Sequence, residues 1–153
     1  MEQLYILSNR LVEDVSMTYQ RYLNSTIDWN EHLIGIRGSR GVGKTTLILQ
    51  HIHANGWTAQ EALYVSLDHV WFTTHTLLQL TEYHYIHGGK YLSLDEIHRY
   101  PNWIQELKNI SEGTLAAVNI QMGTNGRRNQ GEIAIQLWEG DKSIYSWSIS
   151  SSA

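Results

Sequence analysis

One stretch of the sequence decides the fold, and it reads Gly38-Ser39-Arg40-Gly41-Val42-Gly43-Lys44-Thr45. It satisfies the pattern G-x-x-x-x-G-K-[ST], in which the backbone N–H groups of a glycine-rich loop surround a phosphate chain. The apolar segment 33–36 precedes the loop and a helical pattern follows it, so the anion would lie at a helix N-terminus, where the helix dipole favours it. An ordinary glycine-rich turn is the alternative. The strand–loop–helix context argues against it, and we predict a nucleotide phosphate site.

The residue types within this stretch indicate what each would do. Lys44 would place a positive charge on the β- and γ-phosphates, which makes it a candidate catalytic residue, and the Thr45 hydroxyl would bind Mg²⁺. Backbone and side-chain contacts with the nucleotide are expected from Gly38, Ser39, Arg40, Gly41, Val42, Gly43, Lys44, Thr45 and Thr46.

A second motif ends the apolar segment 91–94 with two carboxylates, Asp95 and Glu96. Asp95 would hold Mg²⁺, usually through water, and Glu96 would orient and deprotonate the attacking water. An apolar run that ends in Asp-Glu is by itself common and mostly structural. Its place about fifty residues after Lys44, in the same strand–helix pattern, favours the functional interpretation.

Composition bounds the remaining function classes. At 153 residues, with 42% hydrophobic and 17% charged residues, the chain is typical of one soluble globular domain. The formal net charge of -4 gives no overall basic field for nucleic acid, and the lack of cysteine excludes disulfides and thiolate zinc sites. No apolar run approaches ~18 residues and the N-terminus lacks a signal pattern, so we expect a cytoplasmic protein without a membrane partner.

The first 110 residues alternate between two periodicities. Helical spacing covers residues 7–24, 44–54 and 74–87, and short apolar runs at 33–37, 61–67 and 90–94 indicate strands. Strands that alternate with helices predict an α/β fold, with a mostly parallel sheet covered by helices on both faces.

The pattern changes from residue 111. Apolar and polar residues alternate over 117–122, 132–137 and 143–149, which is typical of half-exposed antiparallel strands. We therefore divide the chain into a core, residues 1–110, and a β-rich tail, residues 111–153.

Three segments resemble a known family. They are Leu33-Ile34-Gly35-Ile36-Arg37-Gly38-Ser39-Arg40-Gly41-Val42-Gly43-Lys44-Thr45-Thr46, Ala62-Leu63-Tyr64-Val65-Ser66-Leu67-Asp68, and Leu92-Ser93-Leu94-Asp95-Glu96-Ile97-His98-Arg99-Tyr100-Pro101-Asn102-Trp103. Over about residues 8–110 the chain is similar to prokaryotic AAA-domain P-loop ATPases that carry a nuclease-like C-terminal domain.

The resemblance implies a P-loop NTPase fold of AAA type, with an additional strand between the Walker A and Walker B strands. It also implies ATP and Mg²⁺ as cofactors and ATP hydrolysis that drives a conformational switch. Self-association follows from the same analogy, and nucleic acid is a partner only through it. Guanine specificity is disfavoured because the sequence has no Asn-Lys-x-Asp motif.

The resemblance ends after Ile110, where the family continues with a strand that ends in a Thr-Gly-Ser-Ser-like sensor and with a lid. A nucleotide-binding module with little or no turnover is therefore the rival hypothesis. Gly123-Thr124-Asn125 is a candidate replacement for the sensor. The sequence leaves open whether the tail reflects truncation or a shifted reading frame.

The AAA-like strand order 5-1-4-3-2 makes a specific demand on the tail. It requires a strand between 33–37 and 91–94, and residues 116–122 are the best candidate. Asn119 and Gln121 are poor residues for a strand buried on both faces. We predict that this segment fills the position imperfectly or not at all, and that the tail forms an antiparallel meander.

Other polar residues receive weaker interpretations. The histidines at 51, 53, 84 and 87 are expected at the solvated surface rather than at a metal, and Trp29 is expected to pack on the first helix rather than to border adenine. His98 is explained by the family segment rather than by a helicase motif. The candidates for an arginine finger are Arg99, Arg127 and Arg128.

Overall fold

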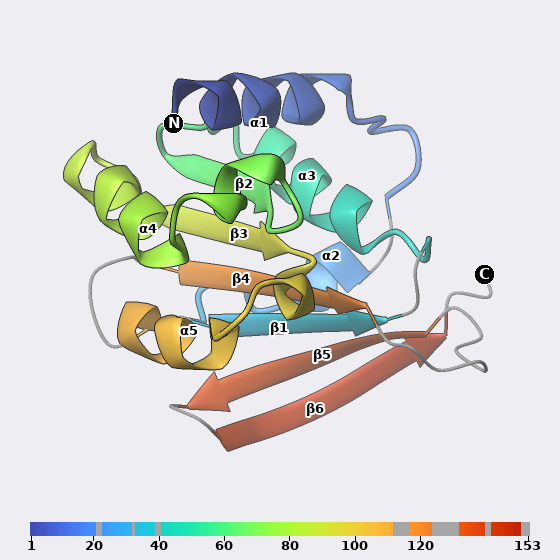
Figure 1. Cartoon of the computed structure of the whole chain (residues 1–153). Coiled ribbons are helices and arrows are strands. Elements are labelled where there is room, and N and C mark those ends of the chain that lie inside the picture. The colour runs from blue at the N-terminus through green and yellow to red at the C-terminus, as the bar shows by residue number, and fades with distance from the viewer. Residues whose placement is uncertain are drawn as a thin grey trace.

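The computed structural model describes residues 1–20, 23–31, 33–38, 41–111, 117–123, 132–139 and 142–150, with side chains up to residue 110 except that of Leu23. Its strands form one six-stranded sheet in the order β2-β3-β4-β1-β5-β6 (Figure 1). They are β1 (Leu33–Gly38), β2 (Ala62–Ser66), β3 (Tyr91–Asp95), β4 (Ala117–Gly123), β5 (Glu132–Glu139) and β6 (Lys142–Ser150). The helices are α1 (Glu2–Asp14), α2 (Leu23–Thr26), α3 (Lys44–Ala54), α4 (Leu77–Ile86) and α5 (Trp103–Ser111), with short 3-10 turns η1 (Val70–Thr73) and η2 (Ile97–Arg99).

The middle of the sheet contradicts the expectation for residues 116–122. Strand β4 lies parallel between β1 and β3, with Gly35 opposite Ile120 and Leu92 opposite Val118. The prediction that this position would stay empty or imperfect is wrong. Without β4, both neighbours would leave a row of unpaired backbone groups inside the sheet, and filling that row outweighs the two polar residues of the segment.

The rest of the tail follows its alternating pattern. Strand β5 pairs antiparallel with β1, and β6 pairs antiparallel with β5. The sheet is thus parallel from β2 to β1 and antiparallel beyond it, and it runs through both the predicted core and the predicted tail.

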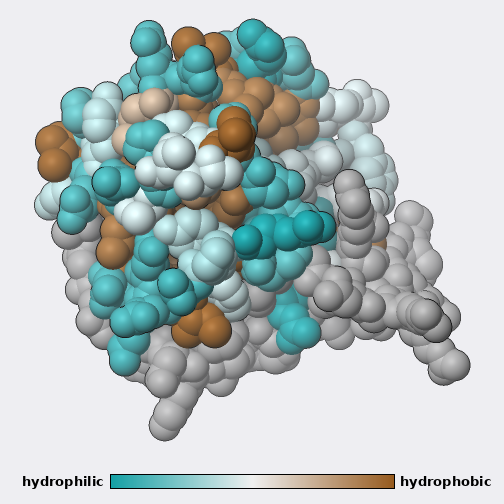
Figure 2. Space-filling view, viewed as in Figure 1, coloured by the Kyte–Doolittle hydropathy of each residue, from teal (hydrophilic) through white to brown (hydrophobic). Residues whose placement is uncertain are grey.

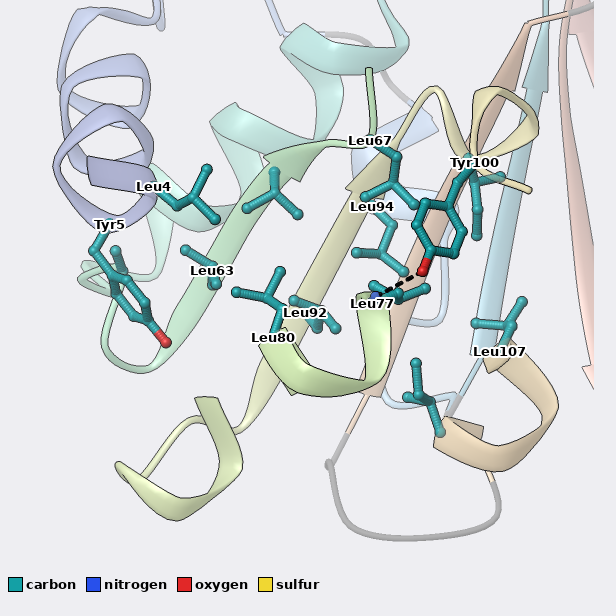
Figure 3. Close-up of a cluster of buried hydrophobic side chains, with 14 of the residues drawn as sticks. Leu4, Tyr5, Leu63, Leu67, Leu77, Leu80, Leu92, Leu94, Tyr100 and Leu107 are labelled. Atoms are coloured by element: carbon teal, nitrogen blue, oxygen red, sulfur yellow. Dashed lines mark hydrogen bonds between the residues drawn. The ribbon is translucent and has the colours of Figure 1, made fainter. Parts of the chain in front are cut away.

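Two clusters of buried hydrophobic residues lie on opposite faces of the sheet. One is formed under α4 and α5 and is drawn in Figure 3. The other is formed under α3 and includes Ile34 and Ile36 of β1, both fully buried. Alternation along β2 explains the division, because Leu63 and Val65 belong to the first cluster and Ala62 and Tyr64 to the second.

Helix α1 covers the β2 edge of the sheet. It contributes Leu4 and Tyr5 to the first cluster and Val12 to the second. Its polar side chains satisfy outward-facing backbone groups, since the Ser8 hydroxyl accepts a hydrogen bond from the Tyr64 N–H at 3.0 Å. The predicted helix 7–24 is wrong in extent, because α1 ends at Asp14 and the Gln50 amide then binds the carbonyls of Ser16 and Tyr19, both at 2.7 Å.

Tyr100 fixes the segment that follows β3. Its hydroxyl accepts the N–H of Leu77 at 3.0 Å, as Figure 3 shows, and donates to Glu106 at 2.9 Å. Tyr100 therefore bridges α4 and α5, and its ring is buried in the first cluster. This holds the turn directly after Asp95 against the core.

The surface shown in Figure 2 is mixed, with hydrophobic residues in separate patches among hydrophilic ones. Isolated exposed hydrophobic residues are ordinary on a folded domain. The large ones exposed in the part of the chain with described side chains are Ile6, Leu7, Tyr19, Val70, Tyr83, Tyr85, Ile86 and Ile104. No helix among the described residues is long and apolar enough to span a membrane.

Candidate functional site

The glycine-rich loop joins β1 to α3, as its sequence predicted. Gly41 has φ 82° and Gly43 has φ 94°, a left-handed conformation that residues with a Cβ rarely adopt. Gly43 precedes α3 and provides no side chain to cap it, and the dipole of α3 favours an anion at this end of the helix. Ser39 and Arg40 lie outside the described residues.

A pocket of about 300 Å³ opens beside this loop. It brings the loop together with the end of β3, and its lining comprises Gly41, Gly43, Lys44, Thr45, Thr46, Asp95 and Glu96. The two motifs, far apart in the sequence, thus meet where parallel strands end. Val42 is different, because its side chain is only 8% exposed and packs into the cluster under α3.

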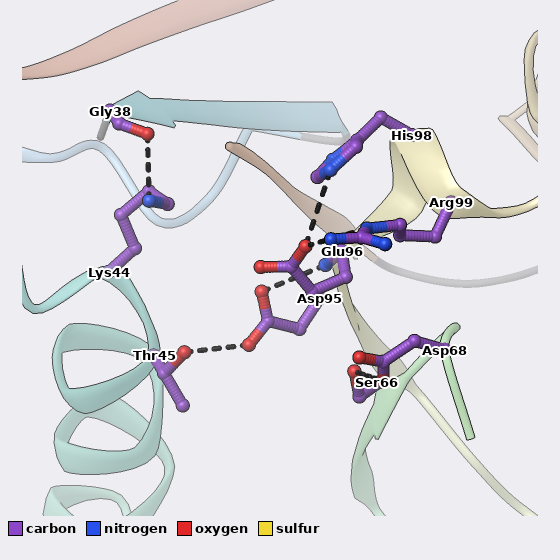
Figure 4. Close-up of polar contacts among 9 residues, drawn as sticks. All are labelled: Gly38, Lys44, Thr45, Ser66, Asp68, Asp95, Glu96, His98 and Arg99. Carbon is purple, nitrogen blue, oxygen red and sulfur yellow. Dashed lines mark hydrogen bonds and ion pairs between the residues drawn. The ribbon is translucent and has the colours of Figure 1, made fainter. Parts of the chain in front are cut away.

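Lys44 is buried in the wall of this pocket. Its side chain is 6% exposed, and its Nζ donates a hydrogen bond to the carbonyl of Gly38 at 2.8 Å (Figure 4). Burial lowers the pKa of Lys44, and the negative charges of Asp95 and Glu96 oppose that shift. A buried cation beside the loop is suited to an anionic ligand, which would stabilise the charge that hydration stabilises on an exposed ammonium group.

Asp95 is held by three donors. The Thr45 hydroxyl donates to Oδ2 at 2.6 Å, the Tyr64 hydroxyl donates to the same oxygen at 2.5 Å, and the Glu96 N–H donates to Oδ1 at 2.8 Å. The Asp95–Thr45 contact, drawn in Figure 4, joins the end of β3 to the start of α3. Burial, followed by the negative charge of Asp95, raises the pKa of Tyr64, so the phenol stays a donor.

These oxygen atoms fit Mg²⁺. The ion prefers oxygen ligands and is usually bound through one or two protein groups together with phosphates and water. Thr45 and Asp95 supply a hydroxyl and a carboxylate at one point of the pocket. Within the described ranges, no group of three or more His, Asp or Glu residues could hold a metal by itself.

Glu96 adopts a left-handed backbone conformation, with φ 53° and ψ 35°. Such a conformation in a residue other than glycine costs of order 1–3 kcal/mol and is found most often at functional sites. Its carboxylate lies 3.3 Å from Nε2 of His98 and 3.8 Å from Nε of Arg99 (Figure 4). The candidate base therefore reaches the pocket, while the turn after β3 provides two nitrogen partners for it.

Tyr64 is the site residue that sequence reasoning missed. It lies in β2, and the register that places Ser66 opposite Asp95 brings the Tyr64 hydroxyl to the same carboxylate. The available signal was a polar aromatic residue within an apolar strand that neighbours the Asp-Glu strand. Arg127 and Arg128 lie outside the described residues, and Arg99 lies beside Glu96.

The histidine expectation is wrong at two positions. His84 is fully buried, where Nε2 donates to the carbonyl of Tyr91 at 2.9 Å and Nδ1 accepts from the Tyr5 hydroxyl at 3.0 Å. His51 stacks on Trp29 with ring centroids 3.7 Å apart, and burial lowers the pKa of His51 to about 4. Trp29 therefore packs on α3.

The solved structure of C. elegans PCH-2 is similar to the chain with a TM-score of 0.40 and 12% sequence identity, over 85% of this chain and 37% of that one. The chain thus spans well under two thirds of that protein's length. No curated protein matches the sequence significantly. The AAA domain family, whose members are nucleotide-binding, ATPase-like modules, matches residues 30–137, which is more than half of the sequence, and the chain belongs to this family.

Proposed function

We propose that this chain binds ATP with Mg²⁺ and hydrolyses it to ADP and phosphate, and that the reaction switches its conformation. The observation that carries the proposal is that one pocket is lined by Lys44, Thr45, Asp95 and Glu96 together. A phosphate loop alone would support binding, whereas a loop that faces a carboxylate pair supports hydrolysis.

Each group has a distinct part in the proposed reaction. The loop amides and Lys44 bind and orient the phosphates, and Lys44 stabilises the charge that develops on the transferred phosphoryl group. Mg²⁺, when bound, neutralises phosphate charge, and Thr45 and Asp95 would hold it. Glu96 orients a water molecule and accepts its proton.

A nucleotide-binding module with little turnover is the second candidate. The contacts of Glu96 with His98 and Arg99 favour it, because they engage the carboxylate oxygen that would otherwise be available to the attacking water. Turnover then requires Glu96 to exchange these partners for the attacking water.

Several finer parts of this proposal rest on resemblance and on sequence. They are the nuclease-like C-terminal companion domain, self-association, a cytoplasmic location and the division at residue 110. The candidate sensor residues, Thr124 and Asn125, lie outside the described residues. They follow Gly123, which the register places opposite Gly38 at the start of the loop.

A single-turnover experiment with radiolabelled ATP and excess protein tests the proposal. Bound nucleotide and released phosphate are measured separately, with and without Mg²⁺. Phosphate release that requires Mg²⁺ supports the ATPase. Tight binding without release supports the second candidate, and the absence of binding contradicts both.

A further inference from the structure

Tyr64 connects the N-terminal helix to the candidate metal site. Its side chain is 6% exposed, and its hydroxyl donates to Oδ2 of Asp95 at 2.5 Å. The same oxygen accepts the hydroxyl of Thr45 at 2.6 Å. Two hydroxyl groups from different elements, β2 and α3, therefore converge on one carboxylate oxygen from β3.

The backbone of Tyr64 is anchored as firmly as its side chain. Strand β2 is the last strand at its end of the sheet, and the Tyr64 N–H is directed to α1 rather than to β3. The hydroxyl of Ser8, itself only 1% exposed, accepts this N–H at 3.0 Å. Tyr64 is thus fixed at two points, and its phenol has little freedom to leave Asp95.

The hydrogen bonds to Asp95 limit how many positions on its carboxylate remain for a metal. An ionised carboxylate has about four lone-pair sites, and the donors from Thr45, Tyr64 and Glu96 occupy three of them. One site then remains for the metal or its bound water. The carboxylate cannot rotate without breaking these hydrogen bonds, and the one from Tyr64 is buried, so its loss costs more than that of an exposed one.

We propose that Tyr64 is a positioning residue that orients Asp95 toward Mg²⁺. The inference rests on the proposed function, since it assigns Asp95 to the metal, and it goes further by placing the control of that carboxylate on β2. Tyr64 acts through Asp95 and is not assigned any contact with the nucleotide. Loss of the Tyr64 hydroxyl should lower the affinity of the site for Mg²⁺ and leave the phosphate loop intact.

The test is the Mg²⁺ dependence of binding of a fluorescent ATP analogue to Tyr64→Phe. The substitution removes only the hydroxyl and keeps the ring in the core. We expect the Mg²⁺ concentration for half-maximal enhancement of binding to rise about three- to tenfold, in the range of one typical lost hydrogen bond. Affinity measured in EDTA should stay at the wild-type value.

Tyr5→Phe is the matched control. Tyr5 is also a buried tyrosine, and its hydroxyl bonds to Nδ1 of His84 at 3.0 Å, away from the pocket. Both variants lose one buried hydroxyl and should lose comparable stability. A purely structural role for Tyr64 would make the two variants alike in Mg²⁺ dependence, and that outcome would overturn the proposal.

Two further results keep the inference separate from the proposed function. If the wild-type chain binds the analogue without any Mg²⁺ effect, the metal assignment of Asp95 fails and this inference fails with it. If the wild type depends on Mg²⁺ and Tyr64→Phe matches it, only the inference fails. If Tyr64→Phe does not fold, Ser8→Ala is tested in its place. We expect a smaller rise in its Mg²⁺ requirement, and an unchanged requirement would contradict the inference.

Discussion

Lys44 and Gly38 are joined by a hydrogen bond of 2.8 Å from the ammonium group to the carbonyl at the end of β1. The bond closes the glycine-rich loop on itself, from the last residue of the strand to the first residue of α3. A phosphate chain would compete with the Gly38 carbonyl for this ammonium group. The proposed binding step therefore includes an exchange of partners by Lys44.

Replacing Lys44 by Ala should lower ATP affinity at least tenfold, or about 1.4 kcal/mol, in a calorimetric titration. The free energy of unfolding should change by about 1 kcal/mol or less, because the lost hydrogen bond is offset by removal of a buried cation. Lys90→Ala is the control, since it removes the same charge from an exposed ion pair with Glu61. Equal ATP affinity in the two variants would contradict the phosphate assignment.

Replacing Glu96 by Gln should preserve Mg-ATP binding and abolish turnover. The amide keeps the shape of the side chain but cannot accept the proton of the attacking water. Phosphate release in single-turnover conditions is the measurement, and Glu82→Gln, an exposed position on α4, is the control. Release at the wild-type rate from Glu96→Gln would show that another group is the base.

Replacing Asp95 by Asn should raise the Mg²⁺ requirement at least tenfold while ATP still binds in EDTA. Thr45, Tyr64 and the Glu96 N–H all donate hydrogen bonds to the Asp95 carboxylate. The NH₂ group of an asparagine cannot accept them, so the side chain at position 95 would also lose part of its anchoring. Mg²⁺ titration of analogue fluorescence measures this, and Asp14→Asn at the exposed end of α1 is the control. An unchanged Mg²⁺ requirement would remove Asp95 from the metal site.

His51 should make the fold sensitive to mild acid. Its pKa is lowered to about 4 in the folded chain, so between pH 6.5 and about 4 only the unfolded chain takes up its proton. This stabilising contribution is complete above pH 6.5 and is lost as the pH falls, with a slope of at most about 1.4 kcal/mol per pH unit. Denaturant unfolding at pH 5 to 6.5 should show a shallower slope in His51→Phe, which keeps a ring against Trp29, and no change in the exposed control His87→Gln.

Gly89→Ala should destabilise the chain by about 1–3 kcal/mol or more, as an overpacked core does. A Cβ at this position would lie 2.4 Å from three atoms of the His84 ring, which is held by hydrogen bonds at both nitrogens. Gly56→Ala is the comparison, because its Cβ would meet nothing within 4 Å and only its φ of 68° opposes the change. Thermal unfolding should rank Gly89→Ala as the less stable variant. The reverse order would mean that α4 and the His84 ring shift at little cost to make room for the Cβ.

The sequence predicted the loop, the strands at 33–37, 61–67 and 90–94, and the meeting of Lys44 with Asp95, because these follow from local patterns and from parallel topology. Prediction from the sequence failed where contacts between residues far apart in the chain determine the local structure. The helical spacing continues past Asp14, but Val15 has φ -66° and ψ 132°, and bonds from Gln50 hold the extended segment that follows.

Strand β4 shows a second limit of sequence patterns. Its alternation of apolar and polar residues is typical of a half-exposed strand, yet the backbone pairs on both sides with β1 and β3. The demand for pairing comes from the neighbouring strands and leaves no mark in the segment itself. In the same way, the contact of Tyr64 with Asp95 depends on strand register, which a single sequence does not specify. The burial of His84 depends on its contacts with Tyr5 of α1 and Tyr91 of β3.

The position of α1 along β2 has a consequence for solubility. An uncovered edge strand offers its N–H and C=O groups to any other extended chain, and natural proteins often cover such edges with a helix. Ser8 and Asn9 of α1 occupy the N–H groups of Tyr64 and Ala59 on this side. A version of the chain that begins after Asp14 would present this edge bare, and edge-to-edge aggregation would be its first defect, before any loss of nucleotide affinity.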